Sequence, residues 1–281
     1  MKTCPHCDRP VEGYGPQCPT CDGFIGYPNV DEVEEPDERS ALEQRYHDAL
    51  EDASNEGADA VVADFKQAVD NAQAVINLSP RDLAFFLTSD SRYEAYRKLI
   101  ETGRRARADR KNDKHRSAVD GILFGTYDKD ICTAALSING EGLISYGSFA
   151  ARFKEATIGH RASLLEENSF DFVKHHNCRP GEPLPQGYRA TWNERGKLAV
   201  AKLGATISPT TNPAEFPRIL LWTEGNRETD RFIEVHIYGS FDRFAVHSVC
   251  GTSKGLSRQD QAWLSAIQDV LINQKSIWVE L

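Results

Sequence analysis

The chain has 281 residues, a formal net charge of -9 and 40% hydrophobic residues. This length allows one large domain or two smaller ones with a substantial buried core. The acidic balance excludes a protein that coats nucleic acid through its overall charge, so any nucleic-acid contact has to come from a local basic patch.

The cysteines and the hydropathy pattern indicate the compartment. Cysteine occurs 7 times, an odd number, and the sequence shows no disulfide framework. No basic-then-apolar leader opens the chain, and no apolar run approaches the roughly 20 residues that a membrane-spanning helix needs. These features predict a soluble protein without membrane contact in a reducing cytoplasm.

The N-terminal segment 1–28 contains two Cys-x-x-Cys pairs, Cys4 with Cys7 and Cys18 with Cys21, each with a proline after its first cysteine. Four thiolates at this spacing are typical of a structural zinc ribbon, in which no coordination position stays open for catalysis. Bound Zn²⁺ would supply the folding free energy that so short a segment lacks, about 10–16 kcal/mol in comparable peptides. Rubredoxin-like iron binding would use the same ligands. The ribbon is either a folded unit that binds no partner or a docking element for nucleic acid or protein.

The next two segments differ in pattern. Residues 29–39 are dense in carboxylates and predict a solvated acidic linker. Over residues 40–117, apolar side chains recur at three and four positions, including Ala72 and Ile76, which predicts a helical region. Ser79 is the predicted N-cap of a further helix in that region.

A basic run from Arg104 to Arg116 ends the helical region. Such a run on a helix is usually a solvated face, and the alternative is a stripe that contacts the phosphates of a nucleic acid. Because no aromatic residues interleave it, the run gives no indication of base stacking.

The pattern changes to strands after Gly121. Strands are predicted at 131–138, 148–154, 218–223, 230–239, 241–249 and 276–281, and helices at 189–203 and from Ser257 onward. Residues 118–281 therefore predict an α+β domain with a mainly antiparallel sheet and flanking helices.

The segment 230–239 alternates apolar and polar side chains, which is typical of a half-buried strand. The predicted core face carries Ile233, Val235 and Ile237, and the opposite face carries Glu234, His236 and Tyr238. A carboxylate, an imidazole and a phenol in one row can form a catalytic site. The alternative is the solvated side of an antiparallel sheet, with the first two side chains as a polar pair.

Three short motifs stand upstream of this strand: Ser145-Tyr146-Gly147, Gly159-His160-Arg161-Ala162-Ser163 and Glu166-Glu167-Asn168-Ser169. Together with the strand they resemble, in order and spacing, ADP-ribosyltransferase-like domains. In that family an Arg or His, a Ser-containing strand and a Glu-bearing strand meet in one NAD-binding cleft. The resemblance covers most of residues 118–281.

The resemblance implies roles for individual residues. Arg161 would lie near the phosphates or ribose of NAD, and Ser163 would support the pocket. Tyr146 would stack on nicotinamide, with Tyr238 as a further NAD-binding residue. The catalytic set would be Glu234, Arg161 and His236, with the Glu234 carboxylate on a ribose hydroxyl.

The chemistry suits these residue types. Breaking the nicotinamide–ribose bond develops positive charge on the sugar, which a fixed carboxylate stabilises. Arginine binds a diphosphate bidentately. The sequence departs from the family in the last motif. In the family this motif is a pair of acidic or amide residues, two positions apart, of which the second is Glu; here Glu234 is followed two positions on by His236. If His236 holds the catalytic position, the domain is inactive or uses altered chemistry; if Glu234 holds it, the upstream partner expected at Phe232 is missing.

A second constellation is His175-His176-Asn177-Cys178, which could bind a metal with help from His160 or His247. Adjacent histidines in a strand point to opposite faces, which disfavours such a site. Nucleophilic Ser-His-Asp or Cys-His catalysis is not indicated, because no GxSxG elbow is present.

The sequence therefore predicts an NAD-cleaving, ADP-ribosyltransferase-like effector, of a toxin or defence type, that modifies an intracellular macromolecule. The acceptor would be a protein or a nucleic acid selected by the zinc ribbon and the basic run. The alternative is a non-catalytic zinc-ribbon module that binds nucleic acid or protein, with a ligand-sensing C-terminal domain.

Overall fold

The computed structural model describes residues 3–11, 13, 15–103 and 111–281, with the backbone alone for 111–114. The described residues form eleven α-helices, short 3₁₀ turns and eight strands. The helices are α1 Pro28–Val33, α2 Pro36–Asn55, α3 Asp59–Asp70, α4 Pro80–Thr88, α5 Tyr96–Glu101, α6 Lys111–Phe124, α7 Glu155–Ile158, α8 Ser169–His175, α9 Arg195–Leu203, α10 Phe216–Leu220 and α11 Arg258–Asn273. The strands are β1 Gln73–Leu78, β2 Ile131–Ser137, β3 Phe149–Phe153, β4 Ala162–Leu165, β5 Arg189–Thr191, β6 Glu234–Tyr238, β7 Val246–Gly251 and β8 Ile277–Glu280.

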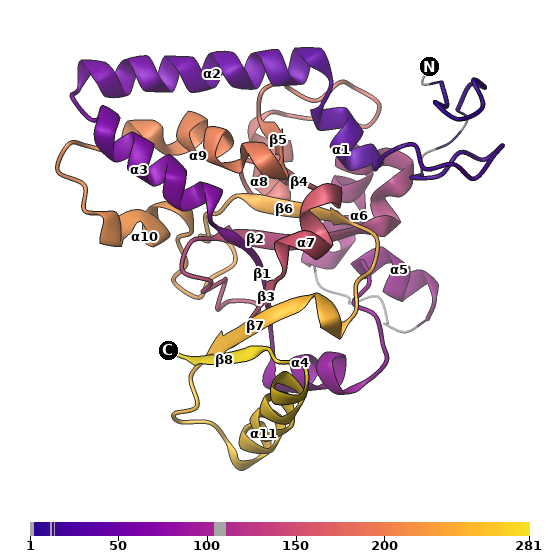
Figure 1. Ribbon diagram of the computed structural model, residues 1–281, viewed down its shortest axis with the longest axis vertical. Helices are drawn as coiled ribbons and strands as arrows, with labels where there is room; N and C mark the ends of the chain where they lie inside the picture. The colour runs from indigo at the N-terminus through magenta and orange to yellow at the C-terminus, as the bar shows by residue number, and fades with distance from the viewer. Residues whose placement is uncertain (1–2, 12, 14, 104–110) are drawn as a thin grey trace.

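All eight strands form one sheet in the order β5-β4-β6-β2-β1-β3-β7-β8. Every neighbouring pair is antiparallel except β7 and β8, which run parallel. The predicted α+β class with a mainly antiparallel sheet is therefore confirmed. In Figure 1, α2, α3, α9 and α10 gather on one side of the strands, while α4 and α11 lie at the β7–β8 end.

Helices cover both faces of the sheet. One face contributes alternate residues such as Ile76, Leu136 and Val235 to the main core, which also holds Phe65 of α3 and Leu198 of α9. The opposite face contributes residues to a second core with α6 and α8; its buried members are Val119, Leu123, Phe124, Tyr127, Ile131, Leu165, Phe172 and Tyr238. Both faces are therefore dry where these cores lie.

This double cover changes the environment of β6. The predicted core side with Val235 and Ile237 is confirmed, and both side chains are fully buried. The alternative of a solvated opposite side is wrong, because Glu234 and His236 are each only 3% exposed and Tyr238 is 8% exposed. The alternation of a strand does not reveal whether helices cover its polar side.

The central strand β1 lies where a helix was expected. Helix α3 ends at Asp70, and the pattern predicted through Ala72 and Ile76 is wrong there, because Gln73–Leu78 pairs with β2 and β3. Pairing on both sides, with buried apolar residues on both faces, outweighs a helical spacing over so short a segment.

The segment 29–39 is not a solvated linker. It forms α1 and the start of α2, each with a proline at its first turn, a position that suits proline because its missing N–H needs no partner there. Glu38 is 2% exposed, and its carboxylate accepts from the backbone N–H of Gly187 at 3.0 Å and pairs with Arg189 at 2.9 Å. A buried carboxylate is tolerated because it is fully partnered.

Two other boundaries differ from the expectations. The predicted helix 189–203 opens with β5, and α9 itself starts at Arg195. The first half of the predicted strand 218–223 belongs to α10, and a single bridge between Trp222 and Arg231 follows. Pro217 in the first turn of α10 favours the helix, because its fixed φ suits that position.

Several expectations are confirmed. Strands β2, β3 and β8 lie where they were predicted, and Ser79 and Ser257 cap α4 and α11 by accepting a backbone N–H three residues on. Among the described residues, none of the helices combines the length and the apolarity that crossing a membrane would require.

Candidate functional site

The four N-terminal cysteines form one cluster. Their sulfurs all lie within 4.8 Å of one another, with Cys4 Sγ 3.7 Å from Cys21 Sγ and Cys7 Sγ 3.8 Å from Cys18 Sγ. This is the ligand set predicted from the spacing, and it can hold a metal ion such as zinc.

The two halves of the cluster have the same backbone geometry. The N–H of His6 points to Cys4 Sγ and that of Thr20 points to Cys18 Sγ, both at 3.4 Å. Asp8 and Asp22 both have φ +56°, so each loop turns back on itself one residue after its second cysteine. N–H groups aimed at sulfur stabilise thiolates, which is what a metal requires.

Tyr27 and α1 connect the N-terminal segment with the four cysteines, which we call the metal ribbon, to the rest of the protein, which we call the body. The ring centroid of Tyr27 lies 5.1 Å from that of Phe24, 5.7 Å from His160 and 5.6 Å from Tyr238. In α1, the side-chain amide of Asn29 donates to three acceptors at 3.0–3.2 Å: the carbonyl of Arg161 just before β4, the hydroxyl of Ser163 on β4 and the carbonyl of His236 on β6. The ribbon is thus docked beside the end of β6.

Glu234, the first residue of β6, is the centre of a buried polar network. Its Oε2 accepts from the backbone N–H of Ser169 at 2.6 Å and from the Ser169 hydroxyl at 2.7 Å. Its Oε1 faces Nη2 of Arg116 at 3.9 Å. Burial acts to raise the pKa of Glu234, but His236, Arg116 and Ser169 outweigh it and hold the pKa at about 2. The carboxylate is therefore ionised at neutral pH.

Arg116 comes from α6, on the other side of Glu234. Its Nε donates to both oxygens of Asp120 at 3.1 Å, and its Nη2 lies 3.3 Å from the hydroxyl of Thr133 on β2. Burial acts to lower the pKa of the guanidinium, but the carboxylates of Asp120 and Glu234 raise it. One cation thus balances two buried carboxylates.

A small pocket of about 120 Å³ opens beside these groups. It is lined by Val75, Ile76, Asn77, Tyr93, Arg116, Thr133, Ala134, Ala135, Leu143, Tyr146, Asn168, Phe232 and Glu234. We call it the Glu234 pocket. It combines an ionised carboxylate, a guanidinium and a phenol with apolar walls, which is the usual composition of a small-molecule site.

Tyr146 is held at this pocket by its neighbours. Gly147 lies so close to β1 that a Cβ there would be 2.1 Å from the carbonyl carbon of Leu78, and its own carbonyl accepts from Asn77 at 3.1 Å. The guanidinium of Arg227 covers the Tyr146 ring, 4.2 Å from its centroid. Burial and the negative charge of Glu234 raise the pKa of the phenol, so it stays protonated at neutral pH.

His236 lies beside Glu234 but outside the Glu234 pocket. The imidazole packs edge-on against Phe124, with ring centroids 4.7 Å apart, and its Nε2 lies 3.5 Å from the Ser169 hydroxyl and 3.9 Å from Glu234 Oε2. His236 does not line the Glu234 pocket, whereas Glu234 and Phe232, two residues before it, both do.

The remaining predicted residues lie at the opposite end of β6. Arg161 donates to the carbonyls of Thr157, Tyr238 and Ser240 at 2.6–3.2 Å, and Ser163 pairs with the Asn29 amide. Burial, followed by Asp130, raises the pKa of Tyr238 to about 12. The structure thus brings Tyr146 and Glu234 together but not Arg161, because Arg161 lies beside Tyr238 at the far end of the strand.

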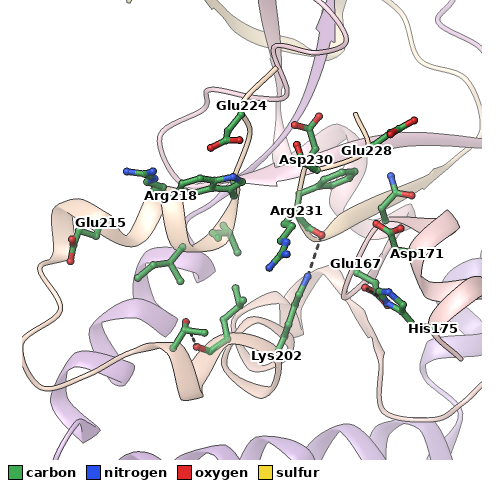
Figure 2. A pocket seen from close by; sticks show the side chains of 18 of the residues that line it. Glu167, Asp171, His175, Lys202, Glu215, Arg218, Glu224, Glu228, Asp230 and Arg231 are labelled. Carbon is green, nitrogen blue, oxygen red and sulfur yellow. Dashed lines mark hydrogen bonds and ion pairs between the residues drawn. The ribbon is translucent and has the colours of Figure 1, made fainter. Parts of the chain in front are cut away.

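A larger hollow of about 1440 Å³ adjoins the Glu234 pocket, and Asn168 and Phe232 line both. Figure 2 shows Lys202 and Arg231 near the middle of this hollow. Burial and the nearby charge of Arg231 act to lower the pKa of Lys202, and the amine donates to the carbonyl of Phe232 at 3.4 Å.

The disfavoured second metal site, the constellation from His175 to Cys178, does not assemble among the described residues. His175 and His176 belong to α8 and its C-cap rather than to a strand. Nδ1 of His175 lies 3.1 Å from Glu167, and the ring of His176 packs between Phe172 and Tyr188. Besides the cysteines, the described residues place Glu166, Glu167 and His176 within 4.8 Å of one another, but Glu166 is already paired with Arg45 at 2.7 Å.

The basic run is only partly visible. Residues 104–110 and the side chains of 111–114 lie outside the described part of the chain, so a nucleic-acid contact there stays a prediction. Its last residue, Arg116, points inward to Asp120 and Glu234. Sequence reasoning assigned no role to Thr133, and none to Ser169 beyond its motif. It placed Arg116 in the basic run, although the four-residue spacing of Arg116 and Asp120 on a helix indicates an ion pair.

Comparison with models of known protein families, and with curated proteins, finds no match for this chain.

Proposed function

We propose that the chain cleaves NAD and transfers ADP-ribose to a macromolecular acceptor at the Glu234 pocket, and that its ribbon holds structural Zn²⁺. The observation that carries the proposal is the Glu234 carboxylate. It is ionised, fixed through one oxygen by Ser169, and lines a pocket that also presents Tyr146 and Arg116. In the resemblance described above, a Glu-bearing strand supplies the central carboxylate.

The size of the pocket limits it to one part of NAD. A cavity of about 150 Å³ lined by apolar side chains is known to hold benzene, and the Glu234 pocket is smaller, about 120 Å³. Only part of the nicotinamide ring would enter it, beside the Tyr146 ring. The rest of the dinucleotide would lie outside it.

The proposed reaction is a substitution at the anomeric carbon of the nicotinamide riboside. The bond from this carbon to the pyridinium nitrogen breaks, and its electron pair leaves on nicotinamide. A lone pair of the acceptor, or of water, forms the new bond, and the proton that the nucleophile loses passes to solvent. Glu234 stabilises the positive charge that develops on the sugar, because its negative charge is preorganised away from water.

The test is nicotinamide release from NAD by the purified full chain, compared between the native protein and Glu234→Gln. We expect release to fall by about 10²–10³-fold, as when one electrostatic group is removed from a preorganised site. The amide keeps the size of the side chain and can still accept from Ser169.

Glu38→Gln is the matched control, because Glu38 is a buried, hydrogen-bonded carboxylate that does not line the pocket. Both variants should be folded at neutral pH, and only Glu234→Gln should release nicotinamide more slowly. Absence of release by the native protein, with NAD and total protein or nucleic acid present, would refute NAD cleavage and favour a non-catalytic binding module.

A further inference from the structure

The larger hollow next to the Glu234 pocket is where an acceptor could approach the reacting carbon. The two spaces share Asn168, at the start of α8, and Phe232, just before β6. On its other sides the hollow is bounded by α9, α10 and the turn 223–229. A group bound in this hollow therefore lies beside the proposed NAD site.

Acidic side chains outnumber basic ones in this hollow. Its lining includes Glu167, Asp171, Glu215, Glu224, Glu228 and Asp230 against Lys202, Arg218 and Arg231. Figure 2 shows Glu224, Glu228 and Asp230 together along the upper side of the hollow. The hollow therefore has an excess of negative charge, which attracts cations.

The basic side chains already have contacts. Lys202 donates to the carbonyls of Glu166 and Phe232. The guanidinium of Arg218 stacks on the Trp222 ring, 3.9 Å from its centroid. Two of the three cations are thus held by the protein itself.

The acidic side chains on the upper side are less well partnered. Within the described residues, neither Glu224 nor Glu228 forms an ion pair. Asp230 is only 3% exposed, and while its Oδ2 accepts from the Ser145 hydroxyl, its Oδ1 has no hydrogen-bond partner among the described residues. The negative charges of Glu224, Glu228 and Asp230 on this wall are thus incompletely balanced by the protein, and a cationic ligand in the hollow would stabilise them through charge.

We propose that this hollow binds an arginine-bearing peptide segment, which makes a basic protein rather than a nucleic acid the acceptor. The inference about the acceptor rests on the proposed NAD cleavage, but binding of the peptide does not. Arginine suits the wall because its planar guanidinium pairs with carboxylates in a fork and is weakly hydrated. A polyanionic acceptor would instead meet the excess of carboxylates and be repelled.

The turn 223–229 connects this hollow to the Glu234 pocket. It presents Glu224 and Glu228 to the hollow, while its Arg227 covers the ring of Tyr146 and donates to the carbonyl of Ser145 at 3.1 Å. A peptide held by the two glutamates would therefore rest on the same turn that packs against the nicotinamide side of the site.

The experiment measures binding without NAD, so that its result is independent of cleavage. A fluorescent peptide of alternating arginine and glycine, and a fluorescent single-stranded oligonucleotide, are titrated with the metal-loaded full chain at low salt. The test variant is Glu224→Gln with Glu228→Gln. The control is Asp269→Asn with Glu182→Gln, which removes the same charge from exposed positions outside the hollow.

We expect the peptide to bind the native protein, the test variant to bind it about fivefold more weakly, and the control to match the native protein. Equal peptide binding by native protein and test variant, or tighter binding of the oligonucleotide than of the peptide, would overturn the proposal. If peptide binding depends on the two glutamates but no nicotinamide is released, the hollow stands and the NAD reaction fails. If nicotinamide is released but peptide binding does not depend on the two glutamates, the NAD reaction stands and the proposal for the hollow fails.

Discussion

The metal ribbon and the Glu234 pocket gather their side chains in opposite ways. The ribbon takes all four ligands from one short segment, Cys4 to Cys21. The pocket takes Arg116 from α6, Tyr146 from a loop and Glu234 from β6, which lie far apart in the chain. The order of the ribbon therefore depends on the metal ion that its cysteines would bind. The geometry of the Glu234 pocket depends instead on the fold that brings its distant elements together.

The two regions also differ in what stabilises them. The buried apolar cluster of the ribbon contains Cys4, Cys18 and Ile25, with Cys7 and Val11 packed against it. The body has a continuous core that spans both halves of the sheet. We therefore expect loss of the metal to affect the ribbon and loss of buried charge balance to affect the body.

The largest effect is expected for Cys18→Ser. Metal binding in comparable four-ligand peptides contributes about 10–16 kcal/mol, so removing one thiolate should abolish stoichiometric metal and the ordered ribbon while the body stays folded. Elemental analysis measures the metal, and amide NMR spectra follow the two regions separately. Cys178→Ser is the control, because this half-buried thiol lies outside the cluster. Cooperative unfolding of the body in Cys18→Ser would show that the two regions are one unit.

Arg116→Ala should destabilise the body by about 3–5 kcal/mol, because Asp120 and Glu234 would be left buried without their cation. Arg161→Ala serves as the comparison. Its guanidinium bonds only backbone carbonyls among the described residues, and its loss should cost about 1–2 kcal/mol. Urea unfolding measures both variants, and equal losses would contradict the central role of Arg116.

The pH dependence of stability should identify Glu234. Its pKa in the folded protein, about 2, lies below its ordinary value of 4.5, so the unfolded chain takes up the proton first as the pH falls. The stabilisation, on the order of 3 kcal/mol, is complete above pH 4.5 and is lost as the pH falls toward 2. Urea unfolding, followed by tryptophan fluorescence, should show a flatter pH profile for Glu234→Gln. Since both proteins share the thiolates of the ribbon, identical profiles would mean that Glu234 is not the group that titrates.

A smaller effect than that of Arg116→Ala is expected for Asn29→Ala, which tests the connection between the two regions. The variant removes a buried amide that donates to β4 and β6, and should cost about 1–3 kcal/mol. Because the contacts of Tyr27 remain, faster amide exchange should appear first in α1. Unchanged exchange in α1 would show that Tyr27 alone docks the ribbon.

Sequence patterns predicted the parts of the molecule that are determined locally. The cysteine spacing identified the ligand cluster, and the N-caps at Ser79 and Ser257 located two helices. Strand β6 was found from its alternation, and Glu234 was singled out on it. In each case the signal lies within a few neighbouring residues.

The rest depends on partners that local patterns do not reveal. β1 was missed because its place between β2 and β3 comes from pairing with residues far along the chain. Arg116 was assigned to a basic surface because a charged run does not reveal that one member turns inward to a buried carboxylate. Arg161 was placed at the site because a motif gives order along the chain, while β6 is long enough to separate its two ends.

The place of β1 in the sheet also determines when this strand can pair during synthesis at the ribosome. β1 leaves the ribosome well before β2 and β3, its two partners, so both of its edges are unpaired for that time. Open strand edges recruit other chains, and long-range pairing is slow. α2 and α3, which are synthesised earlier, can shield one side of the waiting strand, as their position in Figure 1 suggests. The nascent chain should therefore be most dependent on chaperones between synthesis of β1 and synthesis of β3.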